Sequence, residues 1–164
     1  MVKRIIIKKG DILCTEVDGK FKVYFQYVAD DWAQLNSYVI RVFKHHYPMD
    51  YEPNMDEIVA DDIDFYTHVY GLHNAAREGK LYKVGKHPDV GDTENIWFRC
   101  FSEGNINHMT KSYRWYVWKI NVDHTIHIGE LTSEYKHFDI GLIFPFRNVY
   151  DRIRTGKWQI KLVD

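Results

Sequence analysis

The sequence predicts one α+β domain, mainly an antiparallel curled sheet or partial barrel with two or three short helices. Short stretches in which apolar and polar residues alternate recur along the chain, separated by turn-forming residues. Aromatic residues, which favour strands, are frequent, with 12 Tyr, 9 Phe and 5 Trp among 164 residues. This length fits a single compact domain, residues 1–164, whose core needs no disulfide or metal.

The first third of the chain predicts three consecutive antiparallel strands. Gly10-Asp11 forms a turn into a strand at 12–14, and Asp18-Gly19 is a strong hairpin signal. The following strand alternates, with apolar side chains at positions 21, 23, 25 and 27 on one face. A third strand at 38–43 is apolar on both faces apart from Arg41, which predicts a central position in the sheet.

Short helices and strands are expected to follow one another from residue 54 to residue 84. Asn54 and Glu57 form a variant capping box, which predicts a helix at 55–60. Alternation predicts a strand at 63–69. A helix at 72–78 is expected to end at Gly79, and a strand at 80–84 follows it.

The second half predicts three more strands, a longer helix and a final strand. The strands are expected at 96–101, 113–120 and 126–128. Pro145 suits the first turn of a helix, and Gly156 would end that helix before a last strand at 157–163. The apolar stripe of this helix is formed by Phe146, Val149, Tyr150 and Ile153.

Two junctions in the chain resemble each other, because both read helix, Arg-x-Gly-Lys, then strand. The first runs from Arg77 to Lys80 and the second from Arg154 to Lys157. One interpretation is an internal duplication with similar halves at 1–84 and 85–164. The alternative is that many helices end in a basic residue and a glycine.

Charge is unevenly distributed along the chain. Residues 45–76 contain no Lys or Arg but hold seven carboxylates. Without those seven, 16 acidic side chains remain against 22 basic ones, so the rest of the chain is net positive. Such a segment is expected to repel nucleic acid and to attract a basic partner. The seven are Asp50, Glu52, Asp56, Glu57, Asp61, Asp62 and Asp64.

No motif indicates catalysis, a cofactor or a metal. On an extended strand, His124 and His127 would point to opposite faces, so no metal site is expected. The carboxylates at 61, 62 and 64 lack the glycine and distal glutamate of a calcium loop. Cys14 alternates with apolar neighbours and is expected to be a buried thiol, and no nucleophile elbow or phosphate-binding loop is present.

The aromatic strand at 113–120 has two interpretations. Trp115 and Trp118 with interleaved basic residues could stack on single-stranded nucleic acid, but a core strand is the commoner outcome. The chain has no long apolar segment, and its two cysteines form no disulfide framework. A cytoplasmic location is therefore expected.

Three segments of the chain carry a family pattern when they are taken in order. They are Lys9-Gly10-Asp11-Ile12 with Asp18-Gly19-Lys20; 38–43 with Tyr47; and Gly71-Leu72, Ala76-Arg77, Gly79-Lys80, Val84-Gly85, Pro88 and Trp97-Phe98-Arg99. In this order they resemble the immunity protein 26 family of bacterial polymorphic toxin systems. The likeness covers about residues 5–100 and is looser beyond them. One departure is Leu81-Tyr82, where a tryptophan is expected soon after Gly-Lys; the later Gly156-Lys157-Trp158 has it.

The resemblance implies a non-enzymatic cytoplasmic protein that binds and blocks a toxin delivered by a neighbouring cell, with no cofactor. Combined with the charge pattern, it gives the hypothesis that the segment 50–64 contacts a basic, nuclease-type toxin. Tyr47, Tyr51 and Tyr66 would be aromatic anchors. The alternative is an RNA-binding or ribonuclease protein resembling the growth-inhibitor toxins of toxin–antitoxin modules, with Arg41 and Lys44 as candidates. Oligomeric state is left open.

Overall fold

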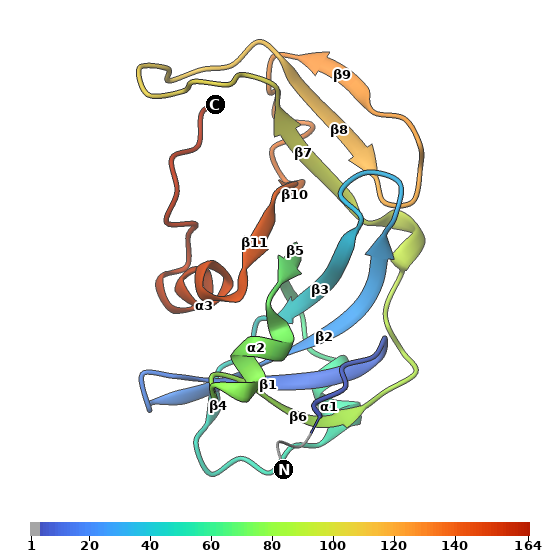
Figure 1. Ribbon diagram of the computed structural model, residues 1–164, viewed down its shortest axis with the longest axis vertical. Coiled ribbons are helices and arrows are strands. Elements are labelled where there is room, and N and C mark those ends of the chain that lie inside the picture. Colours follow the sequence, from blue (N-terminus) through green and yellow to red (C-terminus); the bar gives the residue numbers. More distant parts are fainter. Residues whose placement is uncertain (1–3) are drawn as a thin grey trace.

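The computed structural model describes residues 4–164 and confirms an α+β fold with two open, curled sheets (Figure 1). Met1 to Lys3, at the basic start of the chain, lie outside the described residues. The larger sheet fills the lower part of Figure 1 and the smaller sheet stands above it. No helix in residues 4–164 is long and apolar enough to cross a membrane.

The larger sheet has seven strands in the order β11-β5-β3-β2-β1-β6, with β4 paired to β2. The expected run of three antiparallel strands is confirmed, and β3 is central, between β2 and β5. Asp18 and Gly19 both have positive φ in the hairpin turn between β1 and β2. The strands are β1 (Asp11–Val17), β2 (Phe21–Asp31), β3 (Ser37–Phe43), β4 (Tyr47–Pro48), β5 (Ile63–Tyr70), β6 (Tyr82–Lys86) and β11 (Ile143–Pro145).

The smaller sheet has the order β10-β7-β8-β9. Both sheets are mainly antiparallel, and each has one parallel pair: β11 with β5, and β10 with β7. A 3-10 turn, η1 (Thr93–Asn95), precedes the first strand of the smaller sheet. The strands are β7 (Trp97–Phe101), β8 (Trp115–Lys119), β9 (Ile126–Gly129) and β10 (Asp139–Ile140).

The expected helices all form: α1 (Met55–Val59), α2 (Leu72–Arg77) and α3 (Phe146–Thr155). Asn54 caps α1 by accepting hydrogen bonds from the amides of Asp56 and Glu57. Gly156 ends α3 in the left-handed conformation. The apolar stripe of α3 packs on the larger sheet, where the Phe146 ring lies 5.7 Å from that of Phe25.

The core lies on both faces of the larger sheet. One face packs against α2 and α3, and the other packs against α1 through Tyr24, Phe43 and Ile58. A third cluster joins the two sheets, with Val39 from β3 and Phe98 and Trp118 from β7 and β8. Trp115 is also buried, so both tryptophans of β8 belong to the core.

The prediction of a last strand at 157–163 is wrong, because this segment forms no strand. Its apolar side chains dock separately: Trp158 stacks on Phe144 at 3.8 Å, and Val163 is buried beside Trp115. The strand after α2 begins at Tyr82 rather than 80, because the amide of Lys80 still bonds the Ala75 carbonyl of that helix. Of the two Arg-x-Gly-Lys junctions, only the first leads into a strand.

Candidate protein-binding surface

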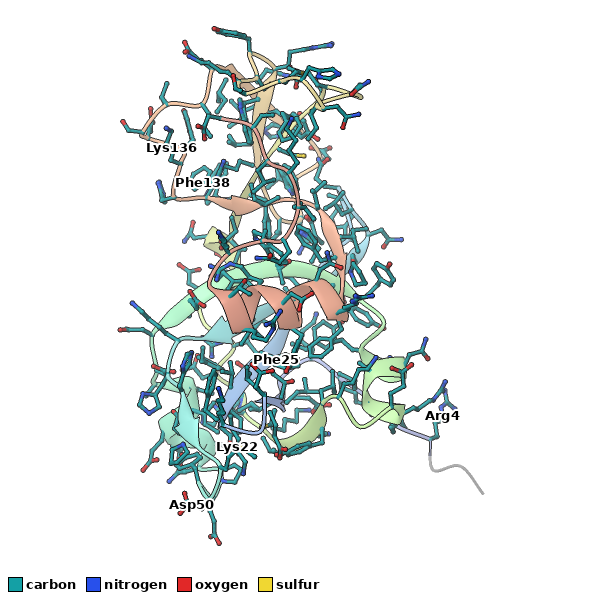
Figure 2. All side chains as sticks on the ribbon, turned by 90° about the vertical axis from the view of Figure 1, so that its left-hand side faces the viewer. Arg4, Lys22, Phe25, Asp50, Lys136 and Phe138 are labelled. Carbon is teal, nitrogen blue, oxygen red and sulfur yellow. The ribbon has the colours of Figure 1, made fainter. Side chains whose placement is uncertain are left out.

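The acidic segment 50–64 contains α1 and lies at one end of the larger sheet (Figure 1). Six of its carboxylates are exposed, and Asp61 is half-buried. Figure 2 shows Asp50 at the lower tip of the molecule. Asp64 is one of the exposed six but lies on β5. We call the surface formed by the other six carboxylates of the segment the acidic face: Asp50, Glu52, Asp56, Glu57, Asp61 and Asp62.

Local hydrogen bonds shape the acidic face. The Tyr51 hydroxyl donates to Glu57 Oε2 at 2.9 Å, and the Tyr51 carbonyl accepts from Lys22 Nζ at 3.2 Å. Asp61 Oδ2 accepts from the backbone amide of His45 at 2.8 Å. These bonds fix the loop on both sides of α1 and leave most carboxylate oxygens free for water or a partner.

Basic residues do not neutralise the acidic face. None of the six carboxylates of the acidic face has a Lys or Arg side-chain nitrogen within 4.0 Å among residues 4–164. Asp56 has a histidine partner instead, His87, whose Nε2 lies 2.9 Å from Asp56 Oδ1. The seventh carboxylate of the segment, Asp64, is the exception, 3.6 Å from Arg152 on α3. The negative charge that the sequence concentrates in 50–64 therefore stays largely uncompensated after folding.

The three tyrosines expected as anchors occupy different environments. Tyr47 is only 8% exposed and packs between Tyr24 and Tyr51, so its ring belongs to the core rather than to the surface. Burial raises the pKa of Tyr47 to about 12. Tyr51 and Tyr66 are half-buried. Of these two, Tyr51 lies at the acidic face and Tyr66 lies on β5 beside Asp64.

Asp64 and Tyr66 line a cavity of about 320 Å³ between β5 and the segment leading into β10. The opposite wall includes Trp97, Phe138 and Asp139, which the sequence did not single out. Asp139 Oδ2 accepts a hydrogen bond from the Tyr66 amide at 2.9 Å, across 73 positions of the chain. Burial raises the pKa of Asp139 to about 6, and the hydrogen bond and nearby Arg152 only partly offset that rise. No local pattern could have revealed this partner, because only the fold brings it to β5.

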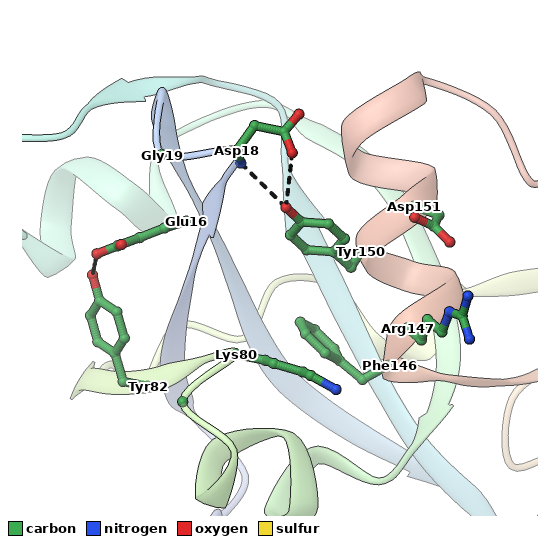
Figure 3. A pocket seen from close by; sticks show the side chains of 10 residues that line it. Glu16, Asp18, Gly19, Lys80, Tyr82, Phe146, Arg147, Tyr150 and Asp151 are labelled. Atoms are coloured by element: carbon green, nitrogen blue, oxygen red, sulfur yellow. Dashed lines mark hydrogen bonds between the residues drawn. The ribbon is translucent and has the colours of Figure 1, made fainter.

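A larger cavity, about 630 Å³, lies between the β1–β2 turn, the start of β6 and α3 (Figure 3). Tyr82 donates to Glu16 at 3.0 Å on one side, and the Tyr150 hydroxyl accepts from the Asp18 amide at 3.2 Å on another. Lys80 also lines it. The cavity therefore mixes acidic, basic and aromatic groups, and its walls favour no single charge.

Arg41, the candidate of the ribonuclease alternative, is a structural residue. It is 4% exposed, and its Nε donates to Gln26 Oε1 at 2.9 Å while its Nη2 donates to the Asp89 carbonyl at 2.8 Å. Lys44 is exposed, but its backbone amide bonds the Asp62 carbonyl, beside the acidic face. The two basic candidates therefore form no open basic cleft with each other.

Asp31, His68 and Trp118 form a buried polar cluster between the two sheets. His68 Nε2 lies 2.8 Å from Asp31 Oδ2, and the Trp118 indole donates to the same oxygen at 3.0 Å. Burial alone would raise the pKa of Asp31, but hydrogen bonds from His68, Trp118 and Asn121 lower it below its ordinary value. All three side chains, Asp31, His68 and Trp118, are closed off from solvent, so this cluster joins the two sheets and cannot reach a substrate.

The cysteines and histidines show no reactive arrangement. Cys14 and Cys100 are buried free thiols whose pKa values are raised by burial. Within residues 4–164, no group of three or more His, Cys, Asp or Glu side chains is placed to hold a metal ion.

No family model, no curated protein and no solved structure matches the chain.

Proposed function

We propose that the protein is a non-enzymatic immunity protein that binds a basic, nuclease-type toxin in the cytoplasm and neutralises it. The observation that supports this proposal is the acidic face, whose six carboxylates have no Lys or Arg within 4.0 Å in the described part of the chain. The resemblance of residues 5–100 to the immunity protein 26 family agrees with it.

The physical basis is electrostatic attraction. A nuclease needs a basic cleft to hold a polyphosphate backbone, and an uncompensated row of carboxylates presents the same charge as that backbone. Such a surface raises the association rate by steering the two proteins together, and contributes less to the lifetime of the complex. The half-buried Tyr51 ring, held by Glu57, offers apolar contact area at the same place.

The test is a charge reversal of three exposed carboxylates that form no hydrogen bond or ion pair in residues 4–164. Asp50, Glu52 and Asp62 are replaced by Lys, and the partner is the toxin domain that co-purifies with this chain from its native host. Because the steering field is reversed there, we expect association to slow by about 10-fold or more at low salt, with a flatter salt dependence. Stopped-flow association at two salt concentrations measures this effect.

The matched control changes net charge equally on another surface. Glu94, Asp123 and Glu134 are exposed, and their replacement by Lys is expected to slow association much less. Equal rates for the two triple variants, or no protection of growing cells when the wild-type chain is co-expressed with the toxin, would overturn the proposal. Cleavage of RNA by the pure chain would support the ribonuclease alternative instead.

A further inference from the structure

The cavity between β5 and β10 is lined by acidic and aromatic side chains. Its ionisable carboxylates are Asp64 and Asp139, and His137 is the other titratable side chain besides Tyr66. No Lys or Arg lines it. The cavity begins where the acidic segment 50–64 ends, because Asp64 belongs to both. Figure 2 shows Phe138, on the far wall, on the same side of the molecule as Asp50.

The two carboxylates have unused capacity for a cation. Asp139 makes one hydrogen bond, to the Tyr66 amide, and has no Lys or Arg nitrogen within 4.0 Å among the described residues. Asp64 uses Oδ1 toward Arg152 at 3.6 Å, from the α3 side. Arg152 and Arg99 offset the desolvation of Asp139 only in part, so an incoming cation gains more here than at a solvated surface.

The walls suit a flat cation. Trp97 and Phe138 stack on each other, with ring centroids 5.5 Å apart and planes at 16°, so they form one aromatic wall. Lys119 Nζ lies 6.0 Å from the Trp97 ring centroid, and Arg152 Cζ lies 4.5 Å from the Phe65 ring centroid. An incoming guanidinium would therefore use the ring surface that these two cations leave free. Tyr66 and Phe65 complete the lining from β5. Guanidinium is planar, stacks flat on aromatic rings and bonds carboxylates through two parallel donors. Ammonium is a compact point charge that can do neither.

We propose that this cavity receives an arginine side chain of a protein partner, with Asp64 and Asp139 as charge partners and the stacked Trp97 and Phe138 rings as one wall. The proposal rests on the proposed function only for the source of the arginine, which is the toxin. The acidic face would then guide the basic partner, and the cavity would hold one of its side chains as an anchor.

The test uses the full chain and N-acetyl-arginine amide as the probe. N-acetyl-citrulline amide is the control, since it has nearly the same shape without the charge. In NMR titrations we expect the indole N–H of Trp97 and the amide of Tyr66 to shift saturably with the arginine probe. A dissociation constant of about 1 mM is expected for a single side chain. The citrulline probe is expected to shift neither signal.

The double variant Asp64→Asn, Asp139→Asn should weaken arginine binding by about 10-fold, which corresponds to about 1.4 kcal/mol. Asp50→Asn with Glu52→Gln, on the acidic face, is the matched control and should change it little. Should the double variant fail to fold, Asp139→Asn alone and Trp97→Leu replace it, because each removes one element of the cavity.

Three results would overturn the cavity proposal: equal shifts with the two probes, unchanged arginine binding in the cavity variants, or shifts confined to the acidic face. A lysine amide probe that binds as tightly as arginine would reject the planar-cation argument. These outcomes are separate from the proposed function. The triple charge reversal tests the toxin complex, and it can succeed or fail while the arginine probe gives the opposite answer.

Discussion

At the scale of single residues, the Asp139 carboxylate accepts a backbone hydrogen bond that a neighbouring strand would otherwise accept. β11 pairs with β5 at His68, Val69 and Tyr70, which leaves the outer edge of β5 open at Tyr66. The Asp139 carboxylate fills this position by accepting the Tyr66 amide at 2.9 Å. An unpaired, partly buried amide is costly, so the carboxylate satisfies the strand while it remains desolvated itself.

Asp139→Asn should therefore change the pH dependence of stability. The native pKa of Asp139, about 6, lies above the ordinary 3.8, so the folded state binds more protons than the unfolded state between these values. The ionised group thus costs stability that grows as pH rises through about 6, by no more than about 3 kcal/mol. Asparagine keeps an acceptor for Tyr66 and carries no charge.

We expect the variant to gain stability over wild type at pH 8 and to lose this advantage at pH 4. Arg152 and Arg99 oppose the effect, while Asp64 adds to it. Urea unfolding of both proteins across this pH range measures the difference. A pH-independent difference would mean that Asp139 is ionised throughout, as it would be if the two arginines compensated its burial.

At the scale of elements, local signals were sufficient wherever the chain itself supplies the partner. The Asp18-Gly19 turn, the Asn54 cap and the left-handed Gly156 were all predictable, because each depends on residues within one turn. β10 and β11, two and three residues long, are set by distant parallel partners and leave no pattern. Segment 157–163 alternates like a strand, but its side chains fill separate gaps in the core.

The candidate site divides in the same way. Asp64, Tyr66 and the acidic face follow from charge and aromatic content within one continuous segment, whereas Asp139, Phe138 and Trp97 come from two other parts of the chain. Nothing in the sequence indicates that they meet, since the meeting depends on how β10 pairs with β7. Tyr47 shows the opposite case, an aromatic in the acidic segment that the fold uses for its core.

A second prediction concerns Gly141, in the short link between β10 and β11. Gly141 donates its amide to the Arg99 carbonyl at 2.8 Å, and a Cβ on it would overlap the buried Trp118 indole. The indole is hydrogen-bonded to Asp31 and has no space to move away. Gly141→Ala is therefore expected to destabilise the fold by about 1–3 kcal/mol in urea unfolding.

Gly104→Ala is the control for this substitution. A Cβ at Gly104 meets no atom within 4 Å, and its φ is not in the left-handed region. Its stability should change by less than about 0.5 kcal/mol. If the two variants were equally stable, the close packing of the β10–β11 link on Trp118 would be disproved.

At the scale of the whole molecule, the two sheets are held together by a buried polar cluster inside an apolar one. Asp31 ends β2, His68 lies on β5 and Trp118 lies on β8, so one carboxylate joins the larger sheet to the smaller. Phe98 packs on the His68 ring at 4.2 Å. If one sheet unfolded alone, a polar side chain of this cluster would lose its hydrogen-bond partner. Because that loss is costly, the stabilities of the two sheets should be coupled.

We predict that residues 4–164 unfold in one cooperative transition and that Asp31→Asn lowers the stability of both sheets together. The loss of a charge-assisted bond to His68 should cost about 1–3 kcal/mol. Tryptophan fluorescence reports largely on the smaller sheet, and amide hydrogen exchange in β3 reports on the larger one. Asp123→Asn is the control, because that carboxylate also lies near a histidine, His124 at 3.4 Å, but is exposed. Should the smaller sheet open at lower urea than β3, the cluster would not couple the sheets, and the cavity between β5 and β10 would open before the acidic face was lost.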